Sequence, residues 1–236
     1  KTKTKEIYEL AEKISSLDFY NSLAICAIKN KYCKPNLNTF GNLRIKNGRH
    51  PIIETIEAER FIPNDLNMSS DQSTIILTGP NMSGKSTFLR QNALIILMAQ
   101  IGSFVPADEA DICIIDKIYT RIGASDNLAL GLSTFKVEMI ETANILNNAT
   151  QNSFVVLDEI GRGTSTYDGM SIAWAVLEYI CTKIKAKTLF ATHYHQLTQL
   201  ENNYSGVKNY HISAKEIEGT LVFLRKVESG GVDKSY

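Results

Sequence analysis

The sequence contains little cysteine, little proline and no long apolar run, and each absence excludes a class of protein. Four cysteines occur among 236 residues, and no two of them form a CxxC pair. This excludes a disulfide-stabilised secreted scaffold, so we expect reduced thiols and a cytoplasmic protein. The longest apolar stretch, near residues 93–99, is far shorter than the ~20 residues that span a bilayer, so we expect no membrane anchor.

An excess of charge of one sign is also missing. Lys and Arg together number 25, as do Asp and Glu, and the formal net charge is zero. Surfaces that bind nucleic acid usually carry a basic excess. We therefore expect this segment alone to bind DNA weakly. With 44% hydrophobic residues the chain can bury a large core, in one sizeable domain or one domain with an appendage.

Hydrophobic spacing predicts how the chain is organised. In the first 34 residues, apolar positions recur at intervals of three and four, which predicts a helix with a charged, stalk-like start. Pro35 ends this helix, and the next forty residues carry short apolar runs broken by glycine and proline, which predict a small β-rich region.

From residue 73 onward, strands alternate with helices. We predict strands at residues 74–78, 154–157 and 188–191, helices at about 86–101 and 171–184, and two β segments at 207–212 and 221–227. Buried strands that alternate with helices are typical of an α/β fold with a mostly parallel sheet and helices on both faces.

A glycine-bearing loop follows the first of these strands. Residues 79–86 read GPNMSGKS, which fits the phosphate-loop pattern GxxxxGK[ST] between a strand and a helix. Glycine lets the backbone curl so that N–H groups and the helix N-terminus converge on a phosphate. Lys85 would contact the β and γ phosphates, and the Ser86 hydroxyl suits Mg²⁺. The predicted nucleotide-binding loop comprises Gly79, Pro80, Asn81, Met82, Ser83, Gly84, Lys85, Ser86 and Thr87.

The strand at residues 154–157 leads into two acids at the edge where sheets of this class place their chemistry. One acid there can hold Mg²⁺, and its neighbour can orient the attacking water and accept its proton. We assign Asp158 to the metal and Glu159 to the water. His193 follows the third strand at the same edge, which favours a role as a sensor of the γ-phosphate.

Three segments together resemble one family. Residues 79–87 read GPNMSGKST, residues 158–169 read DEIGRGTSTYDG and residues 191–194 read ATHY, and with them the sequence closely resembles the MutS mismatch-repair family. The likeness runs from about residue 48 to the end of the chain. It implies a P-loop NTPase of the ABC ATPase type, which binds and hydrolyses ATP with Mg²⁺ between two domains that face each other.

The resemblance also implies further site residues. Phe61 matches the aromatic ring that stacks on adenine, and Ile62 would line the same pocket, although Phe61 could instead be a core aromatic. Asn81 would approach the γ-phosphate from its own subunit. Ser133, in the segment GLSTF, would reach the γ-phosphate of the partner subunit in trans, with a simple helix cap as its alternative. Leu132 stands where many members have Arg, which removes a possible charge from the dimer face.

By resemblance, residues 1–34 are the end of the lever helix region and residues 35–236 are the ATPase domain, without the helix-turn-helix dimerisation part of the family. The implied partners are a second copy, bound through the ATPase face, mismatched DNA, bound through upstream domains, and a MutL-type protein.

Three other functions were weighed against this one. A transporter ATPase fits the phosphate loop, but such proteins usually carry LSGGQ where this chain has GLSTF. A MutS-like paralogue that acts on recombination intermediates is harder to reject, although the Asn81-Met82 loop and Phe61 favour the repair branch. A nucleotide-gated dimerisation module with little hydrolysis in isolation is the third possibility, and Glu159 and His193 argue against it for the parent protein.

Overall fold

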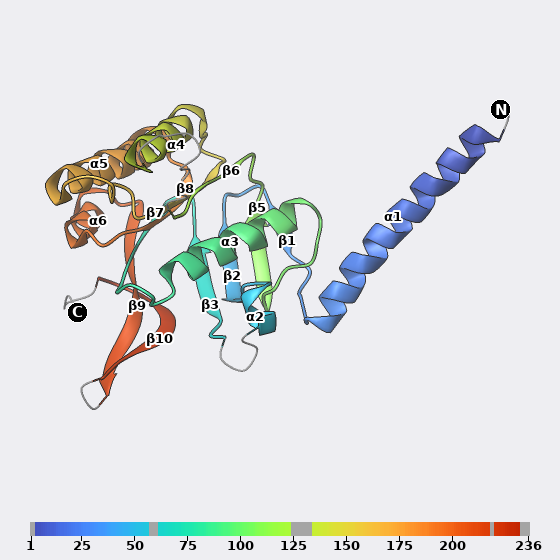
Figure 1. Cartoon of the computed structure of the whole chain (residues 1–236), viewed down its shortest axis with the longest axis horizontal. Helices are drawn as coiled ribbons and strands as arrows, with labels where there is room; N and C mark the ends of the chain where they lie inside the picture. Colours follow the sequence, from blue (N-terminus) through green and yellow to red (C-terminus); the bar gives the residue numbers. More distant parts are fainter. Residues whose placement is uncertain (1–2, 57–60, 124–133, 218–219, 232–236) are drawn as a thin grey trace.

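The computed structural model describes residues 3–56, 61–123, 134–217 and 220–231. Its first element is the long helix α1 (Thr4–Lys29), which extends away from the rest of the chain (Figure 1). Ala27 is the one buried residue that α1 contributes. The stalk predicted from the charged start is therefore present, and it ends at Lys29 rather than near residue 34, because Asn30 closes its last turn through a bond to the carbonyl of Cys26. No helix in the described ranges has the length and apolar character needed to cross a membrane.

The β-rich region forms a sheet of four strands within the described residues. Its order is β1 (Asn36–Asn38), β5 (Glu109–Cys113), β2 (Leu43–Gly48) and β3 (Asn64–Met68). β2 lies antiparallel to both neighbours, whereas β1 and β5 are parallel. Inward and outward residues alternate along β3, which is typical of a sheet with one covered face. The short helix α2 (Ile53–Ile56) lies in the connection between β2 and β3.

A second sheet has six strands among the described residues, in the order β10 (Thr220–Ser229), β9 (Val207–Ile217), β4 (Thr74–Thr78), β8 (Lys187–Ala191), β7 (Phe154–Asp158) and β6 (Ile118–Arg121). All neighbours from β9 to β6 pair in parallel, and β10 closes an antiparallel hairpin with β9. β4, β7 and β8 are buried along their whole length. The prediction of a mostly parallel α/β sheet is confirmed.

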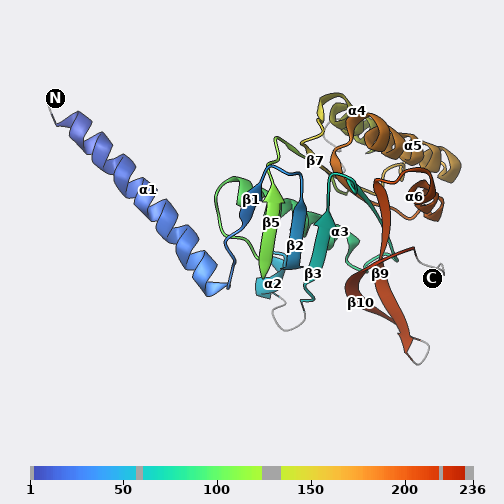
Figure 2. The ribbon, with the colours of Figure 1, turned by 180° about the vertical axis from the view of Figure 1, so that it is seen from behind.

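Helices cover both faces of this sheet. α3 (Lys85–Gln100) packs between the two sheets, as the two opposite views show (Figures 1 and 2). On the other face lie α4 (Thr134–Asn148), α5 (Thr166–Tyr179), a π-helical turn (Ile180–Ile184), a 3₁₀ turn (His195–Gln199) and α6 (Leu200–Asn203). The sheet has a hydrophobic core on each face, and successive residues of β7 point into these two cores alternately. Phe154 and Val156 face α3, while Val155 and Leu157 face α5.

One helix begins earlier than predicted. α5 starts at Thr166, not near residue 171, because Ser165 caps it and accepts a hydrogen bond from the backbone N–H of Asp168 at 3.3 Å. Asp168 in the first turn further stabilises this end through the helix dipole. The cap lies inside the polar DEIGRGTSTYDG segment, where hydrophobic periodicity gives no signal.

Candidate nucleotide-binding site

The phosphate loop joins β4 to α3 and forms the wall of a cavity. Gly84 immediately precedes α3 with φ +108°, a conformation that favours glycine, and it leaves open space in front of the helix. Lys85 is only 4% exposed, and its Nζ donates to the carbonyls of Gly79 at 2.7 Å and Pro80 at 2.9 Å. The cavity has a volume of about 450 Å³ and is lined by Asn81, Met82, Gly84, Lys85, Ser86, Thr87, Glu159 and Arg162. The loop therefore folds around its own lysine and leaves room for an anion.

Asp158 and Ser86 supply adjacent oxygen atoms beside this cavity. The Ser86 hydroxyl donates to Oδ2 of Asp158 at 2.5 Å, and Oδ1 is buried without a hydrogen-bond partner. Burial raises the pKa of Asp158, and the bond from Ser86 opposes that rise. A small hard cation that keeps water and phosphate ligands fits this pair. Among the described residues, no group of three or more His, Cys, Asp or Glu side chains is arranged so that it could hold a metal ion, so protein side chains alone do not complete a coordination shell.

Glu159 lies at the centre of a group of basic side chains. Its carboxylate pairs with Nε2 of His193, lies 2.5 Å from Nη1 of Arg162 and 4.0 Å from Nζ of Lys85. The hydrogen bond with His193 lowers the pKa of Glu159, burial opposes this, and the charges of His193, Arg162 and Lys85 lower it further. Its φ of +56° is unusual for a residue with a side chain and is typical of functional sites. The carboxylate is thus ionised and held by His193, as a general base requires.

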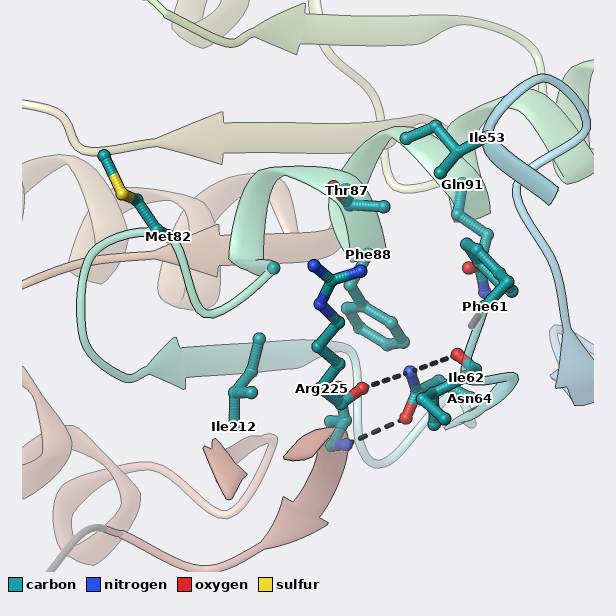
Figure 3. Close-up of a pocket in the computed structure, with 12 residues that line it drawn as sticks. Ile53, Phe61, Ile62, Asn64, Met82, Thr87, Phe88, Gln91, Ile212 and Arg225 are labelled. Atoms are coloured by element: carbon teal, nitrogen blue, oxygen red, sulfur yellow. Dashed lines mark hydrogen bonds between the residues drawn. The ribbon is translucent and has the colours of Figure 1, made fainter. Parts of the chain in front are cut away.

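A second cavity adjoins the first. Its volume is about 160 Å³, and it shares Met82, Gly84 and Thr87 with the wall of the phosphate-side cavity. Phe61 and Ile62 both line it, on the segment that precedes β3 (Figure 3). The structure therefore brings the two residues predicted for the adenine pocket next to the phosphate loop. A nucleotide could place its base in one cavity and its phosphates in the other.

Three polar residues of this pocket were not predicted from the sequence. Arg225 sits at an irregularity of the β9–β10 hairpin with φ +54°, and its side chain extends from β10 toward the first turns of α3 (Figure 3). Asn64 fixes that bulge, since Nδ2 donates to the carbonyl of Arg225 at 2.9 Å and Oδ1 accepts from the N–H of Val227 at 2.8 Å. Gln91 is 1% exposed, and its Nε2 has no hydrogen-bond partner. Gln91 follows Gly84 and Phe88 at helical spacing, so the sequence could have indicated that it faces the same pocket. No local sequence signal indicates the bulge at Arg225.

Ser133, which we predicted to act on a partner subunit, lies outside the described residues. The described chain resumes at Thr134, the first residue of α4. Glu138 in α4 is buried and accepts the backbone N–H of Gly161 at 2.6 Å. The start of α4 is thereby joined to the loop that follows Glu159.

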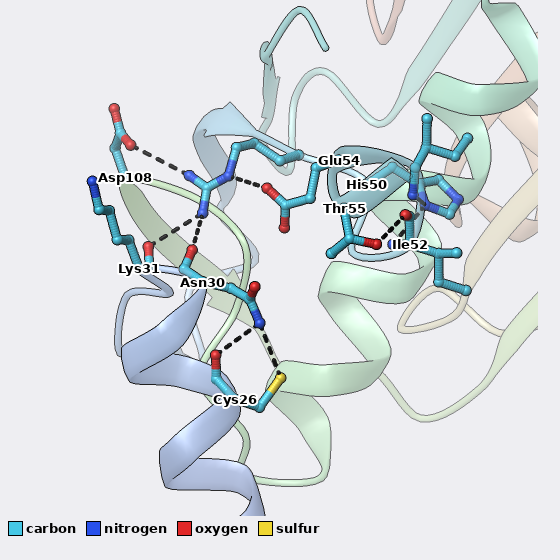
Figure 4. Close-up of polar contacts among 10 residues, drawn as sticks. Cys26, Asn30, Lys31, His50, Ile52, Glu54, Thr55 and Asp108 are labelled. Atoms are coloured by element: carbon cyan, nitrogen blue, oxygen red, sulfur yellow. Dashed lines mark hydrogen bonds and ion pairs between the residues drawn. The ribbon is translucent and has the colours of Figure 1, made fainter. Parts of the chain in front are cut away.

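The pocket is also joined to the stalk (Figure 4). Arg49 donates to the carbonyls of Asn30 at 3.0 Å and Lys31 at 3.2 Å, directly after α1, and its Nε pairs with Glu54 of α2 at 2.6 Å. Ile53, the neighbour of Glu54 in α2, lines the pocket beside Phe61. One arginine therefore connects the root of the stalk to the wall of the pocket.

Comparisons with known proteins agree with this geometry. A family model described as MutS domain V matches residues 75–236. The chain is 59% identical to the DNA mismatch repair protein MutS of Clostridium novyi over 98% of this chain and 26% of that protein. It is 60% identical to the protein of the same name from Thermodesulfovibrio yellowstonii over 99% of this chain and 28% of that protein. The chain thus spans about a quarter of the length of these relatives.

Proposed function

The chain belongs to the MutS family of DNA mismatch-repair proteins, and from this premise we propose that it binds and hydrolyses ATP with Mg²⁺ as an ABC-type ATPase. The observation that supports the proposal most strongly is the meeting of Lys85, Ser86, Asp158, Glu159 and His193 at one sheet edge, beside paired cavities. Lys85 and Ser86 begin α3 after the loop that follows β4, and the other three lie at or directly after the ends of β7 and β8, as expected for a parallel sheet that binds ligands at its carboxyl edge.

Each side chain has a role that its contacts support. Lys85 would exchange the carbonyls of Gly79 and Pro80 for phosphate oxygens, an exchange that keeps a buried ammonium satisfied. Ser86 and the free Oδ1 of Asp158 would hold Mg²⁺, which supplies positive charge to the phosphates. Glu159 would orient a water and take its proton, with His193 holding the carboxylate in place.

The base would stack on Phe61, with Ile62 beside it and Arg225 across the cavity. Gln91 strengthens this assignment, since a buried amide N–H without a partner is costly and a ligand in the pocket could accept from it. Asn81 lines the phosphate-side cavity and could reach the γ-phosphate from its own subunit.

For the whole protein, we propose that nucleotide state is coupled to mismatch recognition and clamp movement on DNA. The path within this chain is Ile53, Glu54 and Arg49, because it joins the pocket wall to the root of α1. A second copy would complete the site through Ser133, mismatched DNA would bind through domains upstream, and a MutL-type protein would be a further partner. The names of the relatives favour mismatch repair over a recombination paralogue.

Nucleotide titration tests the proposal. A fluorescent ATP analogue should bind saturably, Mg²⁺ should strengthen the binding, and release of inorganic phosphate should depend on both. Saturable binding without phosphate release at any chain concentration would instead favour the nucleotide-gated dimerisation module. If neither ATP nor ADP binds, the site has been misassigned.

A further inference from the structure

Glu159 leaves β7 in a backbone conformation that residues with a side chain rarely adopt. Its φ is +56°, and such a residue keeps this conformation only where the surrounding contacts hold it. Its own backbone N–H donates to the carbonyl of Ala191 at 2.9 Å, which ties it to the end of β8. Two residues further on, the chain turns at Gly161, whose φ is +90°. The contacts of Gly161 are therefore the second support for the position of Glu159.

Both backbone polar groups of Gly161 are bonded to side chains. Its N–H donates to Oε1 of Glu138 at 2.6 Å, and its carbonyl accepts from the hydroxyl of Tyr194 at 3.1 Å. Burial and the charge of Glu138 raise the pKa of Tyr194, so this phenol stays protonated at neutral pH and able to donate. A Cβ on Gly161 would collide with the carbonyl oxygen of Gly169, so the turn also packs against the start of α5. Three elements thus hold this one residue.

Glu138 is itself held in place. It is 6% exposed, and its Oε2 lies 3.8 Å from Nη2 of Arg121, the last residue of β6. Nε of Arg121 also pairs with Glu141 of α4 at 3.0 Å. Gly163 packs against the same helix, since a Cβ there would lie 2.9 Å from the Cβ of Phe135. Glu138 is thus fixed between α4 and the sheet, and it can hold the loop after β7 in turn.

We propose that Glu138 is a positioning residue: by holding Gly161, it keeps the carboxylate of Glu159 against His193, in the place from which it can activate water. This rests on the proposed function, because it assigns Glu138 to the base of that reaction. Ile160, between Glu159 and Gly161, is 1% exposed and packs in the core under α5, so a shift at Gly161 passes on to Glu159. Misplacing a reacting group by about 1 Å can lower a rate by roughly 10²-fold.

Substitutions at Glu138 separate its role as an acceptor from its charge. Glu138→Leu removes both, whereas Glu138→Gln keeps a carbonyl oxygen that can accept the N–H of Gly161. Glu138→Asp keeps the charge and withdraws it by one methylene, which makes it a milder variant should Glu138→Leu fail to fold. Glu141→Gln is the matched control, because it removes a charge that pairs with Arg121 from the same helix and leaves the bond to Gly161 intact.

The ring of His193 reports the position of Glu159 without nucleotide or hydrolysis. In protein labelled with ¹⁵N-histidine, Glu159→Ala gives the NMR signals of a His193 ring that has lost its carboxylate partner. Glu138→Leu should move the His193 signals toward these values, and Glu138→Asp should move them part of the way. Glu138→Gln and Glu141→Gln should leave them as in the parent. Parent-like signals in Glu138→Leu and Glu138→Asp would overturn the proposal, whether or not the chain hydrolyses ATP.

Phosphate release gives the second readout. Glu138→Leu should lower kcat by roughly 10²-fold with little change in KM, because the phosphate-loop contacts remain, and Glu138→Gln should restore most of the rate. In a Glu159→Gln background, Glu138→Leu should lower the residual rate by less than about twofold, because a residue that acts through Glu159 has no base left to position.

Equal fold-losses in both backgrounds, or a raised KM with unchanged kcat, would overturn the proposal and make Glu138 a residue that only supports the fold. A parent chain that releases no phosphate would count against the proposed function, and the His193 signals alone would then decide on Glu138.

Discussion

Lys85→Met removes the ammonium at the centre of the phosphate loop and keeps most of the apolar stem. In the structure this ammonium makes two hydrogen bonds, to Gly79 and Pro80, and the residue is 4% exposed. If both bonds pass to phosphate oxygens, two charge-assisted contacts at ~1.5–3 kcal/mol each are at stake, or ~3–6 kcal/mol together.

The net loss in affinity is smaller than that sum. Lys85 gives up two carbonyl contacts when it turns to the phosphates, and this exchange offsets part of the gain. We expect the lower end, ~3 kcal/mol, which corresponds to a dissociation constant for ATP raised by roughly 10²-fold. Folding should survive the change, because burial lowers the pKa of Lys85 and the charged form is already costly, although Glu159 and Asp158 oppose that shift.

Titration with a fluorescent ATP analogue measures the loss, and Lys187→Met serves as the matched control. Lys85 and Lys187 are the two buried lysines among the described residues, and only Lys85 lies at the phosphate loop. The control should bind ATP like the parent. Unchanged affinity in Lys85→Met, or an equal loss in both variants, would refute the assignment of Lys85 to the phosphates.

Three further predictions concern other parts of the chain. Phe61→Ala should weaken the binding of ATP and of ADP alike by ~1–3 kcal/mol, the usual range for base stacking on an aromatic ring. If the variant and the parent bind both nucleotides equally well, Phe61 is a core residue that does not stack on the base. Ser133→Ala should leave ATP binding by the monomer unchanged and lower ATP hydrolysis in dimers. When Ser133→Ala subunits are mixed with Lys85→Ala subunits, each mixed dimer should keep one intact composite site and recover hydrolysis. If mixed dimers form but recover no hydrolysis, Ser133 only caps the helix that follows it. His50 should make the chain less stable as the pH falls: burial and then the charge of Arg90 lower its pKa, so below about pH 6.5 the unfolded chain binds the extra proton. Urea unfolding at pH 7.5 and 5.5 measures the free energy of unfolding at each pH. The loss between pH 7.5 and 5.5 should be smaller in His50→Gln than in the parent, and an identical loss in both would contradict this.

The parts of the fold that depend on local pattern could be predicted from the sequence. β4, β7 and β8 are continuous apolar runs because both of their faces are buried, and the glycine loop identified the start of α3. β5 and β6 were missed because they are short and partly polar, and their pairing partners β1, β2 and β7 are far away in the sequence.

The residues of the candidate site also divide into those that a local sequence pattern predicts and those that only the tertiary structure shows. Lys85, Asp158 and His193 each follow a recognisable strand, so their meeting at one edge could be expected from the sequence. Arg225 enters the pocket only because a bulge in a distant hairpin turns its side chain toward α3, and that bulge depends on tertiary hydrogen bonds from Asn64. Lys187 lay just before the strand predicted at residues 188–191, and only the packing of the two sheets shows that it is the buried first residue of β8.

The central claim is that Glu159 activates water while other residues bind ATP, and Glu159→Gln tests it most directly. The glutamine keeps the size of the side chain and removes the base that His193 and Arg162 hold in place. ATP binding and phosphate release should be measured on the same preparation. We predict retained ATP affinity with hydrolysis reduced by ~10²-fold or more. Loss of ATP binding together with hydrolysis would contradict the account, because it would make Glu159 a structural residue or a metal ligand.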